Sequence, residues 1–226
     1  MEGQYSGVDL LQALQSAHNY NDYLTGLIRR AANSEDLIDF GAGIGTFSAR
    51  LREAGYDVVC IDPDLAQRQR LLEQGFKAFP DIASVPDESA PFIFSLNVFE
   101  HIDDHETAIR QIRQKLKPGG GLFLYVPAFQ CLWSSLDDQV CHCRRYTKTT
   151  LRRLVEGAGF SIETLRYADT LGFFVTLFFR LSRRRVEALT PGSIGFYDRW
   201  IFPPNRVFDL LFHRWLGKNV FVLCRK

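Results

Sequence analysis

The sequence predicts a doubly wound α/β fold, in which helices cover both faces of a mostly parallel sheet. From Asp36 to about residue 168, short continuous apolar runs alternate with segments of helical spacing. Uninterrupted apolar runs are typical of strands that are buried on both faces, as in a parallel sheet. The regular alternation of strand and helix is the pattern of βαβ units.

The elements can be assigned in chain order. Apolar residues recur at helical spacing between residues 8 and 32, which predicts one or two leading helices. Two helices, 44–54 and 65–74, are expected to close at Gly55 and Gly75, because glycine adopts the left-handed conformation of a helix end. A third helix, 104–117, is expected to stop at the Pro118-Gly119-Gly120 sequence. Strands are predicted for residues 37–40, 58–61, 78–79, 92–98 and 122–126.

The last quarter of the chain has a different composition. Residues 160–226 hold 10 of the 19 phenylalanines and two of the three tryptophans, together with Arg180, Arg183, Arg184 and Arg185. Asn219 to Cys224 (NVFVLC) then predicts one more strand. We expect a single domain over residues 1–226, with an N-terminal helical cap (1–35), a core (36–168), an aromatic helical insert or lid (169–218) and a closing strand (219–226).

Composition excludes several classes of protein. Apolar residues make up 46% and charged residues 23% of the 226 positions, which excludes wholesale disorder and a disulfide-rich miniprotein. The net charge of +1 provides no global field for nucleic acid, so we expect no nucleic-acid partner. The first residues do not resemble a secretion signal and the five cysteines are odd in number, so a cytoplasmic location is expected. The most apolar stretch, Leu171 to Phe179, is too short for a membrane span of about 20 residues.

A glycine-rich loop lies between the first predicted strand and the following helix. Gly41, Gly43 and Gly45 allow the backbone to approach a ligand closely, and the free amides of the helix start favour a negative group. The dinucleotide fingerprint G-x-G-x-x-G requires glycine at position 46, where this chain has Thr46. A nicotinamide-dependent oxidoreductase is therefore the less favoured interpretation.

Two acidic residues favour a nucleoside that carries an amino acid. Asp39 directly precedes the glycines, where its carboxylate would repel a pyrophosphate but suit a ligand with an ammonium group. Asp62 ends the second predicted strand, 17 residues past Gly45, at the position from which an acid binds ribose hydroxyls in this fold.

These features belong to a longer series of motifs: LIDFGAGIGTFS, VVCIDPD, Asp81 after the third strand, SLNVFEHIDD and LKPGGGLFLYVP. In order and spacing the series resembles class I S-adenosylmethionine-dependent methyltransferases over residues 36–168. The resemblance implies a Rossmann-like sheet of seven strands whose last strand is antiparallel. It also implies the cofactor S-adenosylmethionine, the product S-adenosylhomocysteine, and methyl transfer by in-line displacement to a small or lipid-linked acceptor.

The resemblance further implies which residues bind the cofactor. Asp39 and the loop Gly41 to Gly45 would frame the methionine part, Asp62 would hold the ribose, and Asp81 with the Ile82 amide would face the adenine. Asp81 has the alternative role of capping the turn before Ile82. Residues 97–99 would line the floor near the sulfonium. The expected cofactor site is therefore Asp39, Gly41, Ala42, Gly43, Gly45, Asp62, Pro63, Asp81, Ile82, Asn97, Val98 and Phe99.

The acceptor is expected beside residues 127–146, because loops at the carboxyl ends of the strands build ligand sites in this fold. A subset of the family is similar here, with a tryptophan, acidic residues and the run H-x-R-R-Y-T. The expected substrate residues are Trp133, Arg144, Arg145 and Tyr146. Paired arginines bind a carboxylate or phosphate, but one of them could instead bridge Asp137 or Asp138 within the loop. His142, and less so His101, are candidate general bases, although transfer to an amine or thiolate can proceed without one.

Two further features have alternative interpretations. Cys131, Cys141, His142 and Cys143 do not have the spacing of a structural zinc site, so no metal is expected. The aromatic segment 171–216 could pack as core or lid, or it could contact a membrane whose anionic headgroups meet its arginines. A noncatalytic nucleoside-binding or membrane-docking module is the alternative to an enzyme.

Overall fold

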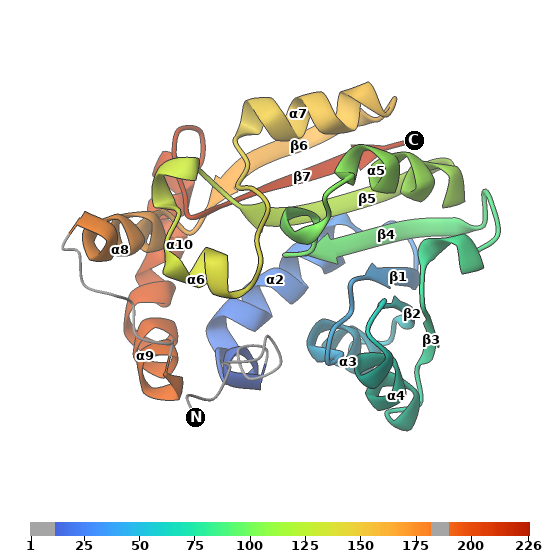
Figure 1. Ribbon diagram of the computed structural model, residues 1–226, viewed down its shortest axis with the longest axis horizontal. Helices are drawn as coiled ribbons and strands as arrows, with labels where there is room; N and C mark the ends of the chain where they lie inside the picture. The colour runs from blue at the N-terminus through green and yellow to red at the C-terminus, as the bar shows by residue number, and fades with distance from the viewer. Residues whose placement is uncertain (1–11, 182–189) are drawn as a thin grey trace.

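A seven-stranded sheet in the order β3-β2-β1-β4-β5-β7-β6 forms the centre of the computed structural model, which describes residues 12–181 and 190–226 (Figure 1). β1 to β5 pair in parallel, whereas β7 runs antiparallel to both β5 and β6. This arrangement confirms the predicted fold class. The strands are β1 (Asp36–Phe40), β2 (Asp57–Ile61), β3 (Lys77–Phe79), β4 (Ala90–Leu96), β5 (Leu116–Pro127), β6 (Ser161–Ala168) and β7 (Asn219–Arg225).

Helices cover both faces of this sheet. The helices of the core are α2 (His18–Ala31), α3 (Thr46–Glu53), α4 (Leu65–Glu73), α5 (His105–Lys115), α6 (Ser135–Gln139) and α7 (Lys148–Gly157). Short 3-10 turns are η1 (Ile82–Ser84), η2 (Phe99–His101) and η3 (Gln130–Leu132). The insert contains α8 (Thr170–Leu181), α9 (Pro191–Phe196), the π-helical turn η4 (Tyr197–Ile201) and α10 (Phe202–Phe212). The part of the leading helical segment before residue 12, and Arg183 to Arg185, lie outside the described residues.

Three strands differ from the sequence-based expectation. β5 begins at Leu116, which pairs with Ala90, so Pro118-Gly119-Gly120 lies inside the strand at a register irregularity rather than between elements. β4 ends at Leu96 instead of Val98, because Asn97 has a left-handed backbone with φ +53°. β6 has no continuous apolar run, since it is an edge strand whose residues are partly exposed.

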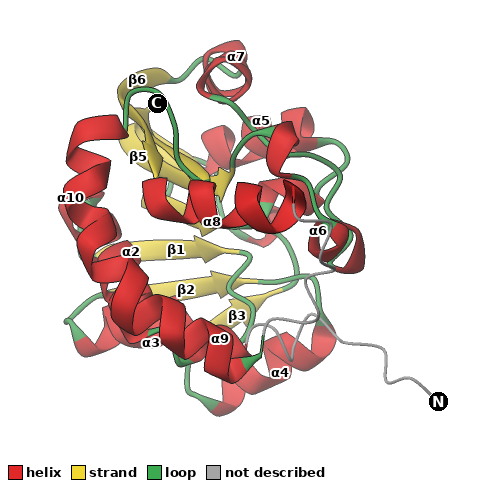
Figure 2. Cartoon of the chain, turned by 90° about the vertical axis from the view of Figure 1, so that its left-hand side faces the viewer, coloured by secondary structure: helices red, strands yellow, loops and turns green. Residues whose placement is uncertain are grey.

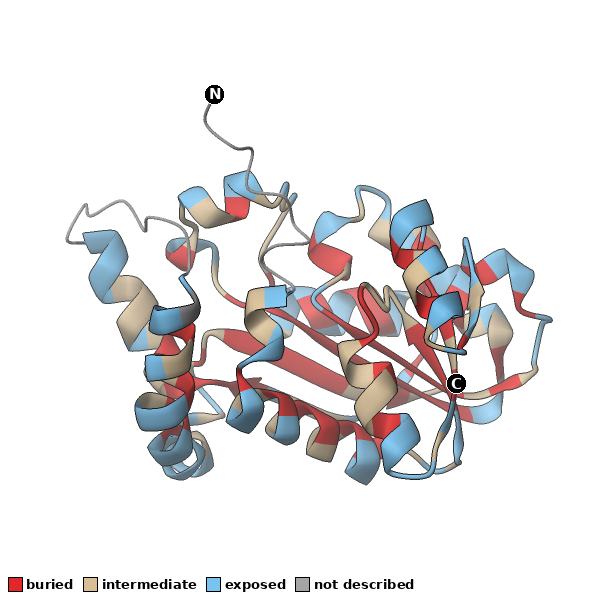
Figure 3. Ribbon diagram, turned by 90° about the horizontal axis from the view of Figure 1, so that it is seen from below, coloured by how far each residue is buried: buried red, intermediate tan, exposed pale blue. Residues whose placement is uncertain are grey.

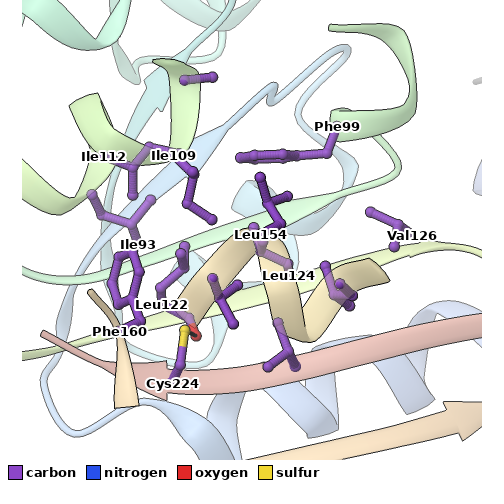
Figure 4. Packing of buried hydrophobic residues seen from close by; sticks show 14 of the residues in the cluster. Ile93, Phe99, Ile109, Ile112, Leu122, Leu124, Val126, Leu154, Phe160 and Cys224 are labelled. Atoms are coloured by element: carbon purple, nitrogen blue, oxygen red, sulfur yellow. Dashed lines mark hydrogen bonds between the residues drawn. The ribbon is translucent and has the colours of Figure 1, made fainter. Parts of the chain in front are cut away.

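The hydrophobic core has two parts, one on each face of the sheet (Figure 3). Side chains of α5 and α7 pack on one face, with Ile109, Ile112 and Leu154 among them (Figure 4). Side chains of α2, α3 and α4 pack on the other face. Along β5, Leu122, Leu124 and Val126 belong to the first part and Phe123 and Tyr125 to the second, which is the alternation expected of a strand buried on both sides.

The aromatic insert lies on the side of the molecule that also carries α2 (Figure 2). The buried Asp198 accepts hydrogen bonds from the backbone amides of Asn19 and Tyr20, which joins η4 to the first turn of α2. Asp209 accepts from the amides of Asp169 and Thr170, which joins α10 to the start of α8. The insert is therefore anchored to the core by buried polar contacts. Across the described ranges, every helix is too short or too polar to cross a bilayer.

Candidate active site

The glycine loop connects β1 to α3 and requires its glycines. Gly41, Gly43 and Gly45 all have positive φ angles, of 85°, 54° and 82°. A Cβ placed on Gly41 would lie 2.2 Å from Cγ2 of Val98, so a side chain there would collide with the segment after β4. The amides of Gly41 and Ala42 both donate to the carbonyl of Ile61, which fixes the loop against the end of β2. The sequence thus forms a backbone cradle at the carboxyl edge of the sheet.

Asp62 completes this cradle from β2. Its side chain is buried, Oδ2 accepts from the Gly43 amide at 2.8 Å and Oδ1 accepts from the Asp64 amide at 2.9 Å. Burial raises the pKa of Asp62, and these backbone hydrogen bonds act in the opposite direction. Each carboxylate oxygen can accept a second hydrogen bond, so both remain able to accept from two vicinal hydroxyl groups. Pro63 is exposed directly after Asp62, and its carbonyl accepts from Arg68.

Asp39 lies behind the loop, where it is buried at 4% exposure. Its Oδ2 accepts a 2.6 Å hydrogen bond from Ser48 of α3, whose hydroxyl also accepts from the Cys60 thiol. Burial raises the pKa of Asp39 to about 7, although the Ser48 hydrogen bond acts to lower it. Asp39 therefore ties β1 to α3, and a direct contact with a ligand stays a prediction.

Asp81 and Ile82 form a turn after β3. The Asp81 carboxylate accepts from the Ala83 amide, so the capping role considered from the sequence is confirmed. The side chain of Ile82 is buried in the core. The hydrogen bonds of this turn use the amides of Ala83, Ser84 and Val85, which leaves the Ile82 amide without a partner in the described part of the chain. Contact of that amide with an adenine stays a prediction.

The segment after β4 places Asn97 and Val98 beneath the glycine loop. Asn97 is exposed, and its amide donates to the carbonyl of Tyr125 on β5 at 2.8 Å. Phe99 differs from the expectation, because its side chain is fully buried and packs against Phe40 with ring centroids 6.1 Å apart. Phe99 therefore belongs to the core and does not line the floor with its side chain.

Sequence reasoning missed two tyrosines beside this floor. Tyr20 of α2 and Tyr125 of β5 lie with their hydroxyl oxygens 3.4 Å apart, and the nearby side chain of Asn97 acts to lower the pKa of Tyr20. Burial raises the pKa of both phenols, so they stay protonated and act as hydrogen-bond donors. Their separation of 105 residues leaves no sequence signal that would pair them.

The loop of residues 127–146, beside which the acceptor is expected, is held together by Asp137. The carboxylate is buried. It accepts hydrogen bonds from Nε and a terminal nitrogen of Arg145 at 2.8 and 3.0 Å. It also bonds Nδ1 of His142 at 2.8 Å and accepts from the Ser134 amide. Burial acts to raise the pKa of Asp137, but the hydrogen bonds from His142 and Arg145 outweigh it and hold the pKa well below its usual value. The intramolecular bridge considered for one arginine is therefore confirmed as Arg145 to Asp137.

Arg144 and Tyr146 are also bound within the protein. The guanidinium of Arg144 donates to the carbonyls of Ile102 and Asp103 at 2.5 and 3.0 Å. The hydroxyl of Tyr146 is buried, donates to the Phe99 carbonyl at 3.0 Å and lies 2.6 Å from Nδ1 of His105. Together with Arg145 they line a cavity of about 420 Å³ between α5 and α7, which lies apart from the glycine loop. These contacts give the R-R-Y part of the motif a structural role, and contact with a substrate stays a prediction.

Trp133, His101 and His142 remain at the accessible side of the loop. Trp133 donates through Nε1 to Asp138 at 2.9 Å, and its ring meets the edge of His142 at 6.5 Å. The imidazoles of His101 and His142 lie edge to face with centroids 4.7 Å apart. Partial burial of the ring, together with the neighbouring His142, lowers the pKa of His101, although the residue as a whole is exposed. The structure thus brings the two predicted candidate bases together.

A buried acid that the sequence did not single out lies beside these histidines. Glu100 is fully buried, and burial raises its pKa to about 8 even though Arg145 acts to lower it. Oε1 of Glu100 lies 3.8 Å from Nε2 of His142. All five cysteines are free thiols, and Cys143 donates to Asp103 at 3.1 Å. The adjacent glutamate and histidine of the EHID motif are visible in the sequence. The third member of the cluster, His142, is brought beside Glu100 only by the fold.

The sheet order and the glycine cradle define a Rossmann-like protein with the fold of class I methyltransferases. A family model described as a methyltransferase domain matches residues 15–165. The chain belongs to this family, and the predicted family is confirmed.

Curated relatives match part of the chain. An uncharacterised methyltransferase of Oceanobacillus iheyensis is 31% identical over 114 residues, covering 45% of this chain and 50% of that protein. A ubiquinone biosynthesis O-methyltransferase of Xanthomonas euvesicatoria is 36% identical over 98 residues, covering 39% of this chain and 41% of that protein. The chain thus spans about half the length of the curated relatives it matches.

Solved structures share the whole fold. An S-adenosylmethionine-dependent methyltransferase of Thermotoga maritima superimposes with a TM-score of 0.64 at 15% identity, over 96% of this chain and 95% of that one. Phosphoethanolamine N-methyltransferase 2 of Haemonchus contortus, solved with S-adenosylhomocysteine, gives a TM-score of 0.62 at 17% identity over 92% of this chain and 52% of that one. The cofactor of the confirmed family is S-adenosylmethionine.

Proposed function

We propose that this protein transfers the methyl group of S-adenosylmethionine to a small or lipid-linked acceptor. The observation that supports it most is the joint geometry of Gly43 and Asp62, which presents a backbone cradle and a doubly accepting carboxylate at one edge of the sheet. A vicinal diol fits the carboxylate, and Gly41, Gly43 and Gly45 add no side chains to the loop. The amino acid part would lie over the loop, beside Asn97 and Val98.

The reaction is an in-line displacement. A lone pair of the acceptor forms a bond to the methyl carbon while the bond from sulfur to methyl breaks, and its electron pair returns to sulfur as S-adenosylhomocysteine. The protein's contribution is to align the acceptor behind the methyl group and to exclude water. The relatives include both an O-methyltransferase and an N-methyltransferase, so they do not select the acceptor atom.

A turnover assay tests the enzyme against the alternatives. The protein is incubated with S-adenosylmethionine labelled in its methyl group and with lipid or aqueous extracts as acceptors. We expect label to enter an extract component with release of S-adenosylhomocysteine. Binding of S-adenosylhomocysteine without any turnover would identify a noncatalytic nucleoside-binding module, whereas binding of NADH alone would identify an oxidoreductase.

The lipid-linked class of acceptor is supported by apolar side chains that the insert exposes. Phe178, Trp200, Leu210, Leu211 and Trp215 are between 62% and 74% exposed. Arg199, Arg206 and Arg214 are exposed on the same elements or just after them. A surface that combines aromatic and aliphatic side chains with arginines suits the headgroup region of an anionic bilayer. We infer peripheral membrane contact through residues 171–216.

Vesicle flotation tests this contact. We expect the protein to float with vesicles that contain phosphatidylglycerol and much less with pure phosphatidylcholine. The double variant Leu210→Ser, Leu211→Ser should lose flotation, while the matched variant Leu65→Ser, Leu72→Ser, which removes exposed leucines of α4, should retain it. Equal flotation of both variants, or none for the parent, would contradict membrane contact.

A further inference from the structure

Three side chains that can ligate a metal ion converge where η2 meets the loop after α6. One ligand atom each from Glu100, His101 and His142 lie within 4.8 Å of one another. The backbone amide of Cys143 donates to the Glu100 carbonyl at 2.7 Å, which pins the loop against η2. The cluster follows the end of β4 and therefore lies at the same edge of the sheet as the glycine loop.

Glu100 is the strongest sign that something is bound here. Its side chain is fully buried, yet both carboxylate oxygens are without a hydrogen-bond partner among the described residues. Arg145 could neutralise it, but its nitrogens are already committed to Asp137 and to the Ala128 carbonyl. A buried carboxyl group without a hydrogen-bond partner is costly, and either a proton or a bound cation would lower that cost.

His142 is oriented by a second hydrogen bond. Its Nδ1 bonds Asp137, which directs Nε2 toward Glu100 at 3.8 Å. His101 lies beside the backbone of Val140 and Cys141, in the loop that also carries His142. Histidines that ligate metals are usually held in this way, with one ring nitrogen bound to a carboxylate or carbonyl and the other turned to the metal.

We propose that Glu100, His101 and His142 bind a divalent first-row transition metal ion. Ligand atoms that each lie about 2.1 Å from one metal are about 3 to 4 Å apart, so the 3.8 Å separation fits and the 4.8 Å limit requires only a small side-chain shift. Two imidazoles and one carboxylate suit Zn²⁺ or Fe²⁺ better than Mg²⁺ or Ca²⁺. Three protein ligands leave at least one coordination position for water or for an oxygen of the acceptor.

This assignment makes the two histidines ligands in place of general bases. It shares only His142 with the zinc pattern that the sequence spacing argued against, and it replaces the cysteines with Glu100 and His101. Cys141 and Cys143 flank His142 and are exposed, so they are the competing ligands that an experiment must separate. The proposal does not depend on S-adenosylmethionine binding, because it is tested with metal alone.

The test is titration of the chelator-treated protein with Co²⁺ and Zn²⁺, followed by absorption spectroscopy and calorimetry. We expect one ion per chain and a cobalt spectrum without the charge-transfer band that thiolate ligands give. Glu100→Gln, His101→Gln and His142→Gln should each weaken binding by more than about tenfold. The controls His18→Gln and the double variant Cys141→Ser, Cys143→Ser should bind as the parent does.

Loss of binding in the cysteine variant, or parental affinity in the Glu100 and His101 variants, would overturn the proposal. Because His101 is exposed, His101→Gln is expected to fold normally, and its circular dichroism and melting temperature check this. It therefore decides the question even if the buried Glu100 variant is unstable. A parent protein that binds neither ion would show that the cluster is only hydrated.

Discussion

The Oδ2 atom of Asp62 accepts a 2.8 Å hydrogen bond from the backbone amide of Gly43. The last residue before Pro63 and the middle glycine of the loop thus hold each other in place, although they come from different βα units. This contact leaves one face of the carboxylate able to bind hydroxyl groups of a ribose. It is the structural basis of the proposed cofactor site.

Replacing Asp62 should therefore weaken cofactor binding. In Asp62→Ala two hydrogen bonds to ribose are lost, so we expect the Kd for S-adenosylhomocysteine to rise more than about tenfold in calorimetry. Asp57→Asn, which changes an exposed acid at the start of the same strand, is the control and should keep the parental Kd. An unchanged Kd in Asp62→Ala would remove Asp62 from the site.

Gly41 should tolerate no side chain. Gly41→Ala adds a methyl group 2.2 Å from Val98, on a backbone with φ +85°. Gly55→Ala is a matched control, because it has φ +93° but nothing within 4 Å. We expect Gly55→Ala to cost about 1 kcal/mol in urea unfolding, from backbone strain alone, and Gly41→Ala to cost clearly more. Equal losses in the two variants would show that the contact with Val98 relaxes freely.

Asp39 should make stability depend on pH. Its folded pKa of about 7 lies above the unfolded value of 3.8, so the folded state holds a proton that the unfolded state releases. The bound proton therefore stabilises the folded state below about pH 4, and this stabilisation is lost as the pH rises to about 7. The loss in the free energy of unfolding is at most roughly 4 kcal/mol. Asp39→Asn, whose amide oxygen can still accept from Ser48, should flatten this part of the profile. Chemical unfolding from pH 4 to 8 measures it, and a parallel profile for Asp39→Asn and the parent would contradict the raised pKa.

The ion pair between Arg145 and Asp137 is expected to stabilise the loop of residues 127–146 rather than to bind the acceptor. Arg145→Ala leaves a buried carboxylate with fewer partners, so we expect a loss of about 3 to 5 kcal/mol in the free energy of unfolding. Arg145→Lys should restore little, because an ammonium cannot make the paired contacts of a guanidinium. Arg152→Ala, which breaks an exposed helical ion pair, should cost under about 0.5 kcal/mol. If Arg145→Ala kept parental stability yet raised the KM for an acceptor, the original expectation of substrate contact would be restored.

The sequence predicted the fold well because the buried strands are continuous apolar runs and the loop glycines have no alternative. The sequence also predicted where Asp62 and the glycine loop lie, because each directly follows a predicted strand. The sequence left two roles open for Arg144 and Arg145, and it could not choose between them because exposure cannot be read from a motif. The partners that Arg144, Arg145 and Tyr146 contact lie on η2, the loop that follows it, and α6. Glu100 escaped notice because its significance arises only when the fold brings His142 within 3.8 Å.

A crystal structure grown with S-adenosylhomocysteine tests the central claim most directly. The account predicts density for the nucleoside along the carboxyl edge of β1 and β2, with both ribose hydroxyls within hydrogen-bond distance of Asp62 and the amino acid part over Gly41 to Gly45. Density for the nucleoside at another face of the protein, or an empty crevice at millimolar ligand, would contradict it.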